Sequence, residues 1–212
     1  MVSGFSMKNG LFFGGFLLLI VLAALSGYIM RNKAPSQVES NKILATQGVP
    51  ADNQLNVEKK QEQANMYQKA GDYSKAIGVL KELVGTAPTP DATVLTRIAD
   101  FYVKNKNVIE GEKYLKEAEQ LDNKMPYLYR TYAQLYIAKG DYKKAMESMD
   151  YSLKLADNDQ GRFYGYMGLA QLNQMQQNFV DAKLNVEKAL KIIPNEESAI
   201  KMMQQLKNPK EK

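Results

Sequence analysis

The sequence of 212 residues contains no cysteine and no histidine. Without cysteine the chain has no disulfide, no thiol nucleophile and no cysteine ligand for a metal. Without histidine it lacks the side chain that most often acts as a general base near neutral pH, and also the commonest zinc ligand. Because these absences exclude most nucleophilic and metal-dependent enzyme mechanisms, we expect neither catalysis nor a metal or other cofactor.

Positive and negative charges are interspersed rather than segregated. The formal net charge is +5, yet Lys and Glu alternate in stretches such as EGEKYLKEAEQ, residues 110–120. Such a mixture is typical of solvent-exposed helix faces, whereas surfaces that bind nucleic acid concentrate Lys and Arg with aromatic residues between them. The sequence therefore predicts no nucleic-acid partner.

A long apolar run lies near the start of the chain. No charged residue occurs between Lys8 and Arg31, and Leu11–Met30 is twenty residues long. A helix of that length measures about 30 Å, which matches the hydrocarbon thickness of a bilayer. We therefore predict a transmembrane helix at residues 11–30, after a short segment at residues 1–10. The alternative is a cleaved signal peptide, because Ala24–Ser26 offers the small residues that a signal peptidase selects.

The residues that flank this run bear on topology. A short basic N-terminus before an apolar helix is typical of a bacterial inner-membrane anchor whose N-terminus is cytoplasmic, although Arg31 and Lys33 act against that orientation. We favour a single-pass membrane protein whose following domain lies outside the cytoplasm. Residues 31–52 are mostly polar and contain two prolines and a glycine, so they are predicted to form a flexible linker.

One short phrase occurs twice. Residues 71–77, GDYSKAI, return as GDYKKAM at residues 140–146. The offset of 69 residues is about twice the 34-residue period of a helix-turn-helix repeat. An intermediate copy is marked by Tyr102. This residue lies 35 residues after Tyr67 and 34 residues before Tyr136, which occupy the equivalent positions of the two flanking copies. Gly followed by Asp predicts that one helix ends in a left-handed residue and that the Asp caps the next.

The repeated units resemble the tetratricopeptide repeat family, in which small and large apolar residues recur at fixed positions of two helices. The small residues that match the family pattern are Ala64, Ala99, Ala133 and Ala170 in the first helices and Ala76, Ala145 and Ala182 in the second. Some positions depart from the pattern, because Gly111 stands in place of Ala and Asn173 in place of the first-helix Tyr. Lys60 and Gln63 also weaken the match at the start of the first unit. The resemblance implies an all-α solenoid whose first helices line a concave groove.

The resemblance divides the soluble part into about four repeats and a cap. The repeats are predicted at residues 53–90, 91–124, 125–159 and 160–195, followed by a capping helix at 196–208 and a tail at 209–212. We place a three-residue insertion in the loop before the fourth repeat, within residues 155–163. In the capping helix Ile200, Met203 and Leu206 share one face, which is expected to cover the last repeat.

Residues that project into the groove are the candidates for partner binding under this resemblance. They are Asn65, Asp100, Lys104, Tyr127, Arg130, Gln134, Tyr164, Met167, Gln171 and Met175. The Tyr and Met side chains of the C-terminal half suit an extended peptide or an amphipathic helix of a protein partner. We expect Tyr127 and Tyr164 to be exposed and to form the central binding surface with Arg130 and Met167. Gln61 stands where family members that bind chaperone C-termini carry a clamp lysine, which disfavours that class of ligand.

The leading interpretation is a membrane-anchored scaffold that binds a protein partner to recruit or assemble a membrane-associated complex. One alternative is a self-associating structural component, with a homodimer formed through the span or the first repeat. Another is a secreted soluble protein, released after signal-peptide cleavage. A third is an enzyme that uses only carboxylates, for which the candidates are Glu110, Glu112, Glu117 and Glu119. Their Lys-rich surroundings are more typical of a solvated helix face.

Overall fold

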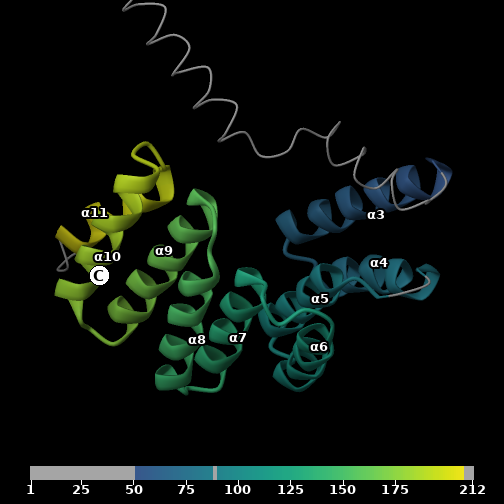
Figure 1. Cartoon of the computed structure of the whole chain (residues 1–212), viewed down its shortest axis with the longest axis horizontal. Helices are drawn as coiled ribbons and strands as arrows, with labels where there is room; N and C mark the ends of the chain where they lie inside the picture. Colours follow the sequence, from purple (N-terminus) through teal and green to yellow (C-terminus); the bar gives the residue numbers. More distant parts are fainter. Residues whose placement is uncertain (1–50, 88–89, 208–212) are drawn as a thin grey trace, which may run out of the picture. The chain divides into compact units, whose positions relative to one another are not determined.

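The computed structural model describes residues 51–87 and 90–207, and all regular secondary structure in these residues is α-helical (Figure 1). Among the described residues, 56–87 and 90–207 form one compact unit. Among the helices described, none is both long enough and apolar enough to cross a membrane. The predicted span at Leu11–Met30, the segment before it and the predicted tail lie outside the described residues.

The helices follow one another with short connections (Figure 1). They are α3 (Ala51–Lys69), α4 (Tyr73–Thr86), α5 (Ala92–Lys104), α6 (Val108–Leu121), α7 (Pro126–Ala138), α8 (Tyr142–Leu155), α9 (Asp159–Met175), α10 (Phe179–Ile192) and α11 (Glu197–Lys207). The helices pair as α3 with α4, α5 with α6, α7 with α8 and α9 with α10, and each pair packs on the next. The result is an all-α helical-repeat solenoid. Helix α3 begins inside the stretch predicted to be linker.

The same turn joins the two helices of every pair. Each turn contains one left-handed residue with φ between 60° and 75°, and these residues are Gly71, Lys106, Gly140 and Gln177. The next residue caps the second helix with a side-chain oxygen, and these caps are Asp72, Asn107, Asp141 and Asn178. The amide of each cap donates to a first-helix carbonyl five residues earlier, and these acceptors are Tyr67, Tyr102, Tyr136 and Asn173. The predicted Gly–Asp turns are confirmed, and four copies are in phase.

Small residues let neighbouring helices approach closely. The seven alanines matched to the family pattern all have fully buried side chains. Gly111 allows a closer approach still, because a Cβ atom there would lie 2.8 Å from Cγ2 of Val103 and 3.3 Å from the carbonyl oxygen of Ala99. Helix α6 therefore packs on α5 at a distance that leaves little room for an alanine, which explains this departure from the family pattern.

The extra residues before the fourth pair lie in a helix and not in a loop, so the predicted loop insertion is wrong. The connection from Leu155 to α9 is short, and α9 has 17 residues where α5 and α7 have 13. Asn158 caps the lengthened helix by accepting a 2.7 Å hydrogen bond from the amide of Gly161. Because Asp159 also forms an ion pair with Arg162, the additional first turn of α9 is stabilised at its start.

Helix α11 closes the end of the last pair. Ala199, Met203 and Leu206 are buried and belong to one cluster with Ala182, Val186 and Ala189 of α10. The sequence pattern predicts that Ile200 shares this buried face, but its side chain is 39% exposed. The buried stripe of α11 is therefore rotated by about one residue from the predicted one, and it begins at Ala199.

Candidate binding pocket

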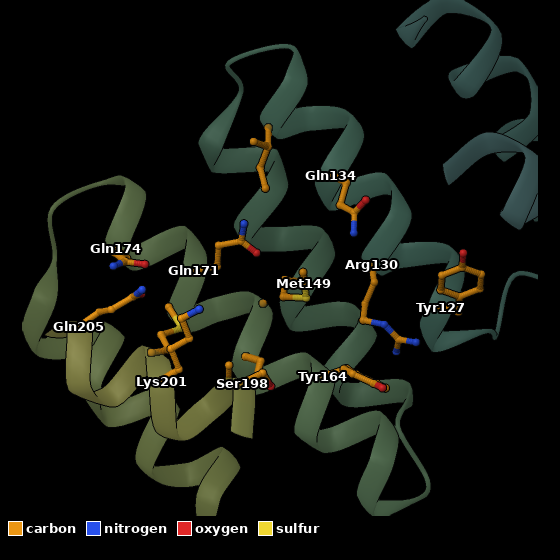
Figure 2. Close-up of a pocket in the computed structure, with 14 residues that line it drawn as sticks. Tyr127, Arg130, Gln134, Met149, Tyr164, Gln171, Gln174, Ser198, Lys201 and Gln205 are labelled. Atoms are coloured by element: carbon orange, nitrogen blue, oxygen red, sulfur yellow. The ribbon is translucent and has the colours of Figure 1, made fainter. Parts of the chain in front are cut away.

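A pocket of about 490 Å³ lies between the last two helix pairs and α11 (Figure 2). Its lining comes from α7, α8, α9 and α11, and we call it the α7–α11 pocket. Helices α7 and α9 are the first helices of the third and fourth pairs. The pocket therefore lies on the first-helix side of the solenoid, where the resemblance places the groove.

Gly168 in α9 makes room for a methionine side chain in one wall of the pocket. A Cβ atom on Gly168 would lie 2.5 Å from Sδ of Met149, so the missing side chain lets Met149 of α8 reach the pocket lining. Met167 and Met202 also line the pocket. Unbranched thioether side chains adapt to partners of different shape, so this part of the lining is apolar and deformable.

Arg130 is held between two tyrosines (Figure 2). Its guanidinium carbon lies 5.5 Å from the centre of the Tyr127 ring and 5.4 Å from that of Tyr164. Its Nη1 is buried and has no hydrogen-bond partner among the described residues. Burial lowers the pKa of Arg130, while the neighbouring Tyr127 and Tyr164 act in the opposite direction. The arginine stays charged, because a guanidinium keeps its proton in proteins.

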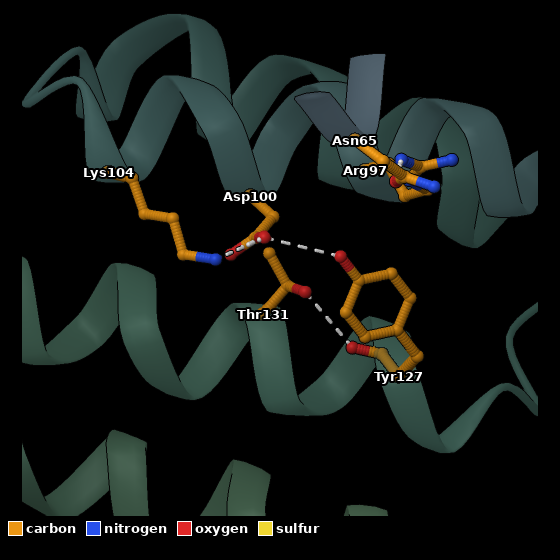
Figure 3. A network of polar contacts seen from close by, with 6 residues as sticks. All are labelled: Asn65, Arg97, Asp100, Lys104, Tyr127 and Thr131. Atoms are coloured by element: carbon orange, nitrogen blue, oxygen red, sulfur yellow. Dashed lines mark hydrogen bonds and ion pairs between the residues drawn. The ribbon is translucent and has the colours of Figure 1, made fainter. Parts of the chain in front are cut away.

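Tyr127 is fixed by a polar network that reaches α5 (Figure 3). Its hydroxyl donates to Oδ2 of Asp100 over 3.3 Å, and the same oxygen accepts a 2.7 Å hydrogen bond from Lys104. The carbonyl of Tyr127 accepts a 3.0 Å hydrogen bond from the Thr131 hydroxyl. Burial, followed by the charge of Asp100, raises the pKa of the Tyr127 phenol, so the phenol remains a hydrogen-bond donor. The tyrosine ring is thereby positioned against Arg130.

The structure brings six of the ten predicted partner-binding residues together in the pocket lining. They are Tyr127, Arg130, Gln134, Tyr164, Met167 and Gln171. Tyr164 is 45% exposed, as expected. The expectation for Tyr127 is wrong in part, because its side chain is half-buried and its hydroxyl is already bonded.

The other four predicted residues lie outside the pocket lining. Asp100 has a buried side chain and is paired with Lys104, so it supports Tyr127 instead of offering an open surface. Asn65 is exposed on α3, where its Oδ1 accepts a 2.6 Å hydrogen bond from Arg97. Met175 is exposed at the C-terminal end of α9.

Helix α11 contributes a wall of the pocket that the repeat pattern does not predict. Ser198, Lys201, Met202 and Gln205 line the pocket, and their spacing places them on one face of the helix. The apolar stripe of this segment predicts a capping role alone. The sequence feature that indicates this wall is a second stripe at the same helical spacing, made of polar residues and one Met.

Comparisons with known proteins agree with this architecture. A family model described as "Tetratricopeptide repeat" matches residues 128–159. No curated protein matches the sequence. The fold is similar to that of pilF from Pseudomonas aeruginosa, with 15% identity over 73% of this chain and 69% of that chain and a TM-score of 0.60.

It is also similar to the fold of TTC0263, a thermophilic TPR protein from Thermus thermophilus, with 20% identity, coverage of 68% and 77% respectively, and a TM-score of 0.60. The repeat match and these structural neighbours support the tetratricopeptide repeat family. At such low identity the structural likeness shows the fold alone.

Proposed function

We propose that this chain is a membrane-anchored tetratricopeptide scaffold that binds a protein partner in the α7–α11 pocket and thereby recruits or assembles a membrane-associated complex. The observation that carries the proposal is the pocket itself, with tyrosines, methionines and an arginine in its lining. Aromatic residues, Met and Arg are the residues most enriched at the centres of protein interfaces.

The lining favours binding over catalysis. No Asp or Glu is among the residues that line the pocket, so the pocket offers no carboxylate as a general base. Two of the four glutamates considered for a carboxylate enzyme, Glu112 and Glu119, have structural partners instead. Glu112 pairs with Lys116 at 3.1 Å and also with Lys139, and Glu119 accepts a hydrogen bond from Tyr132.

The anchoring part of the proposal rests on sequence. Leu11–Met30 is free of charge and long enough to span a bilayer, and a single basic residue precedes it. We place the chain in a bacterial inner membrane with the solenoid outside the cytoplasm. Resistance of the full chain to alkaline extraction from membranes, lost when residues 1–30 are deleted, would support the anchor. Protease digestion of the solenoid in intact spheroplasts would support the topology.

A photoreactive residue tests the pocket directly. Tyr164 lines the pocket and is exposed, so a photoreactive amino acid at this position should crosslink the partner in native membranes. Lys144 is the matched control, because it is exposed on α8 and lies outside the pocket lining. Mass spectrometry then identifies the captured proteins. A partner captured from Tyr164 and not from Lys144 supports the proposal. Equal capture from both positions, or capture of this chain alone, contradicts it.

A further inference from the structure

The charged residues that line the α7–α11 pocket are both positive. They are Arg130 and Lys201. Neither forms an ion pair with any residue in the described part of the chain. A half-buried guanidinium without a carboxylate partner loses hydration that the fold does not replace. The pocket is therefore complementary to a group with negative charge.

Arg130 is also pre-organised for such a group. The rings of Tyr127 and Tyr164 lie on it at 5.5 Å and 5.4 Å, and Tyr127 is itself held by Asp100. Contacts with aromatic faces hold a planar guanidinium in one orientation while leaving its hydrogen-bond donors without an acceptor. A side chain that is already ordered loses little entropy when a carboxylate binds to it.

The remaining polar lining favours an extended chain over a helix. Gln134, Gln171, Gln174 and Gln205 line the pocket on α7, α9 and α11. Each amide offers a donor and an acceptor, which suits the free N–H and C=O groups of an extended backbone. A helix satisfies those groups internally and would leave the glutamines without such partners.

We propose that the α7–α11 pocket binds an extended segment of the partner protein that carries an Asp or Glu side chain. Its carboxylate lies on Arg130, its backbone is held by the glutamines, and a neighbouring apolar side chain packs against Met149, Met167 and Met202. This inference rests on the proposed function and specifies the chemistry of the partner segment.

The test uses the full-length chain and a display library of random peptides that are fused at their C-termini, so that only side-chain carboxylates are available. Three variants are compared with the parent chain. Arg130→Gln removes the charge in the pocket, and Gln171→Trp places a bulky side chain at an exposed part of the lining. Arg162→Gln is the matched control, because Arg162 lies on α9 outside the lining and pairs with Asp159. Thermal melting checks that each variant is folded.

The expected result is enrichment of peptides with an Asp or Glu by the parent chain and by Arg162→Gln. For a selected peptide, Arg130→Gln should raise the Kd by at least about tenfold, as should replacing the peptide's acidic residue by its amide. The two changes together should weaken binding no more than either alone, which is the signature of a direct contact. An amidated peptide C-terminus should leave the Kd unchanged.

Three other outcomes overturn the inference, and they do so in different ways. Peptides that lose binding with Gln171→Trp but keep the same Kd with Arg130→Gln occupy the pocket without a carboxylate, so the proposed function survives and the acidic segment does not. Binders that come only from a second library with free C-termini, and that lose binding on amidation, assign the carboxylate to a chain terminus instead. Failure to select peptides from either library, or selected peptides that are insensitive to Gln171→Trp, contradicts the proposed function as well.

Discussion

The hydroxyl of Tyr132 on α7 donates a 2.8 Å hydrogen bond to Oε2 of Glu119 on α6. The neighbouring Tyr129 hydroxyl lies 3.4 Å from Oε1 of the same glutamate and 3.0 Å from the carbonyl oxygen of Asn123. Burial, with the Glu119 charge next, raises the pKa of Tyr129 to about 12. Burial and the hydrogen bond to Glu119 raise the pKa of Tyr132 as well. These phenols therefore join the second and third pairs only in their protonated form.

Stability should consequently fall as the pH rises above about 10, the usual pKa of a tyrosine in an unfolded chain. Above that pH the unfolded state loses phenol protons that Tyr129 and Tyr132 retain in the fold, so the free energy of unfolding decreases up to the folded-state pKa. Tyr132→Phe should cost about 1–2 kcal/mol near neutral pH and make the alkaline decline shallower. Urea unfolding across this pH range measures both effects. Tyr142→Phe, at an exposed position on α8, is the control, and an equally shallow decline in that variant would contradict the assignment.

The four turns predict substitutions of opposite sign at equivalent positions. Lys106 and Gln177 adopt left-handed backbone angles that cost a non-glycine residue about 1 kcal/mol, so Lys106→Gly and Gln177→Gly should each stabilise the fold by up to that amount. Gly140→Val should destabilise it by about 1–2 kcal/mol. No atom lies within 4 Å of a Cβ built on Gly140, so the backbone angle alone causes this cost.

Chemical denaturation measures these three changes, and Lys143→Ala, at an exposed position on α8, is the surface control. A destabilised Lys106→Gly variant, or a Gly140→Val variant as stable as the control, would show that the left-handed angle does not set the stability of the turn.

The turns also show how far the sequence predicts the fold. The dipeptides Gly71–Asp72 and Gly140–Asp141 predict two of the four turns, because Gly tolerates positive φ and Asp caps the following helix. The other two turns have the same geometry with Lys106–Asn107 and Gln177–Asn178. The presence of glycine does not predict these two turns, because the helix packing holds a non-glycine residue in the left-handed region. In those copies only the Asn cap at the repeat spacing marks the turn.

The candidate site was less predictable than the repeats. Position within a repeat identified Arg130, Tyr164 and Met167 as residues of the pocket lining. It failed for Asp100, because periodicity gives the face of a helix but not whether the next repeat covers it. It also missed Lys201, since the placement of α11 beside α9 depends on tertiary packing that no repeat pattern describes.

Two helical glycines should respond in opposite ways to alanine. Gly78 lies in α4 with no atom within 4 Å of a Cβ built on it, so Gly78→Ala should stabilise the fold by about 0.5–1 kcal/mol through helix propensity. Gly111→Ala gains the same propensity but brings Cβ within 2.8 Å of Cγ2 of Val103. Overpacking of this kind costs about 1–3 kcal/mol, so the net effect should be destabilising. Thermal melting of the two variants compares them directly. A gain in melting temperature for Gly111→Ala would show that α5 and α6 separate freely.

Substitutions in the buried stripe of α11 should affect stability, and substitutions in its pocket-lining stripe should affect binding. Leu206 is 8% exposed and packs in the cluster that covers α10, so Leu206→Ala should lower the free energy of unfolding by about 2 kcal/mol. Lys201→Gln changes only the stripe that lines the pocket, and it should leave stability within about 0.5 kcal/mol of the parent chain. Chemical denaturation gives the first comparison, and affinity for a selected acidic peptide gives the second.

We expect Lys201→Gln to weaken that affinity, because it removes one of the two positive charges of the lining. Gln204→Ala, on the exposed side of α11, should change neither property. If Lys201→Gln destabilised the fold as much as Leu206→Ala, the division of α11 into a capping stripe and a binding stripe would be wrong.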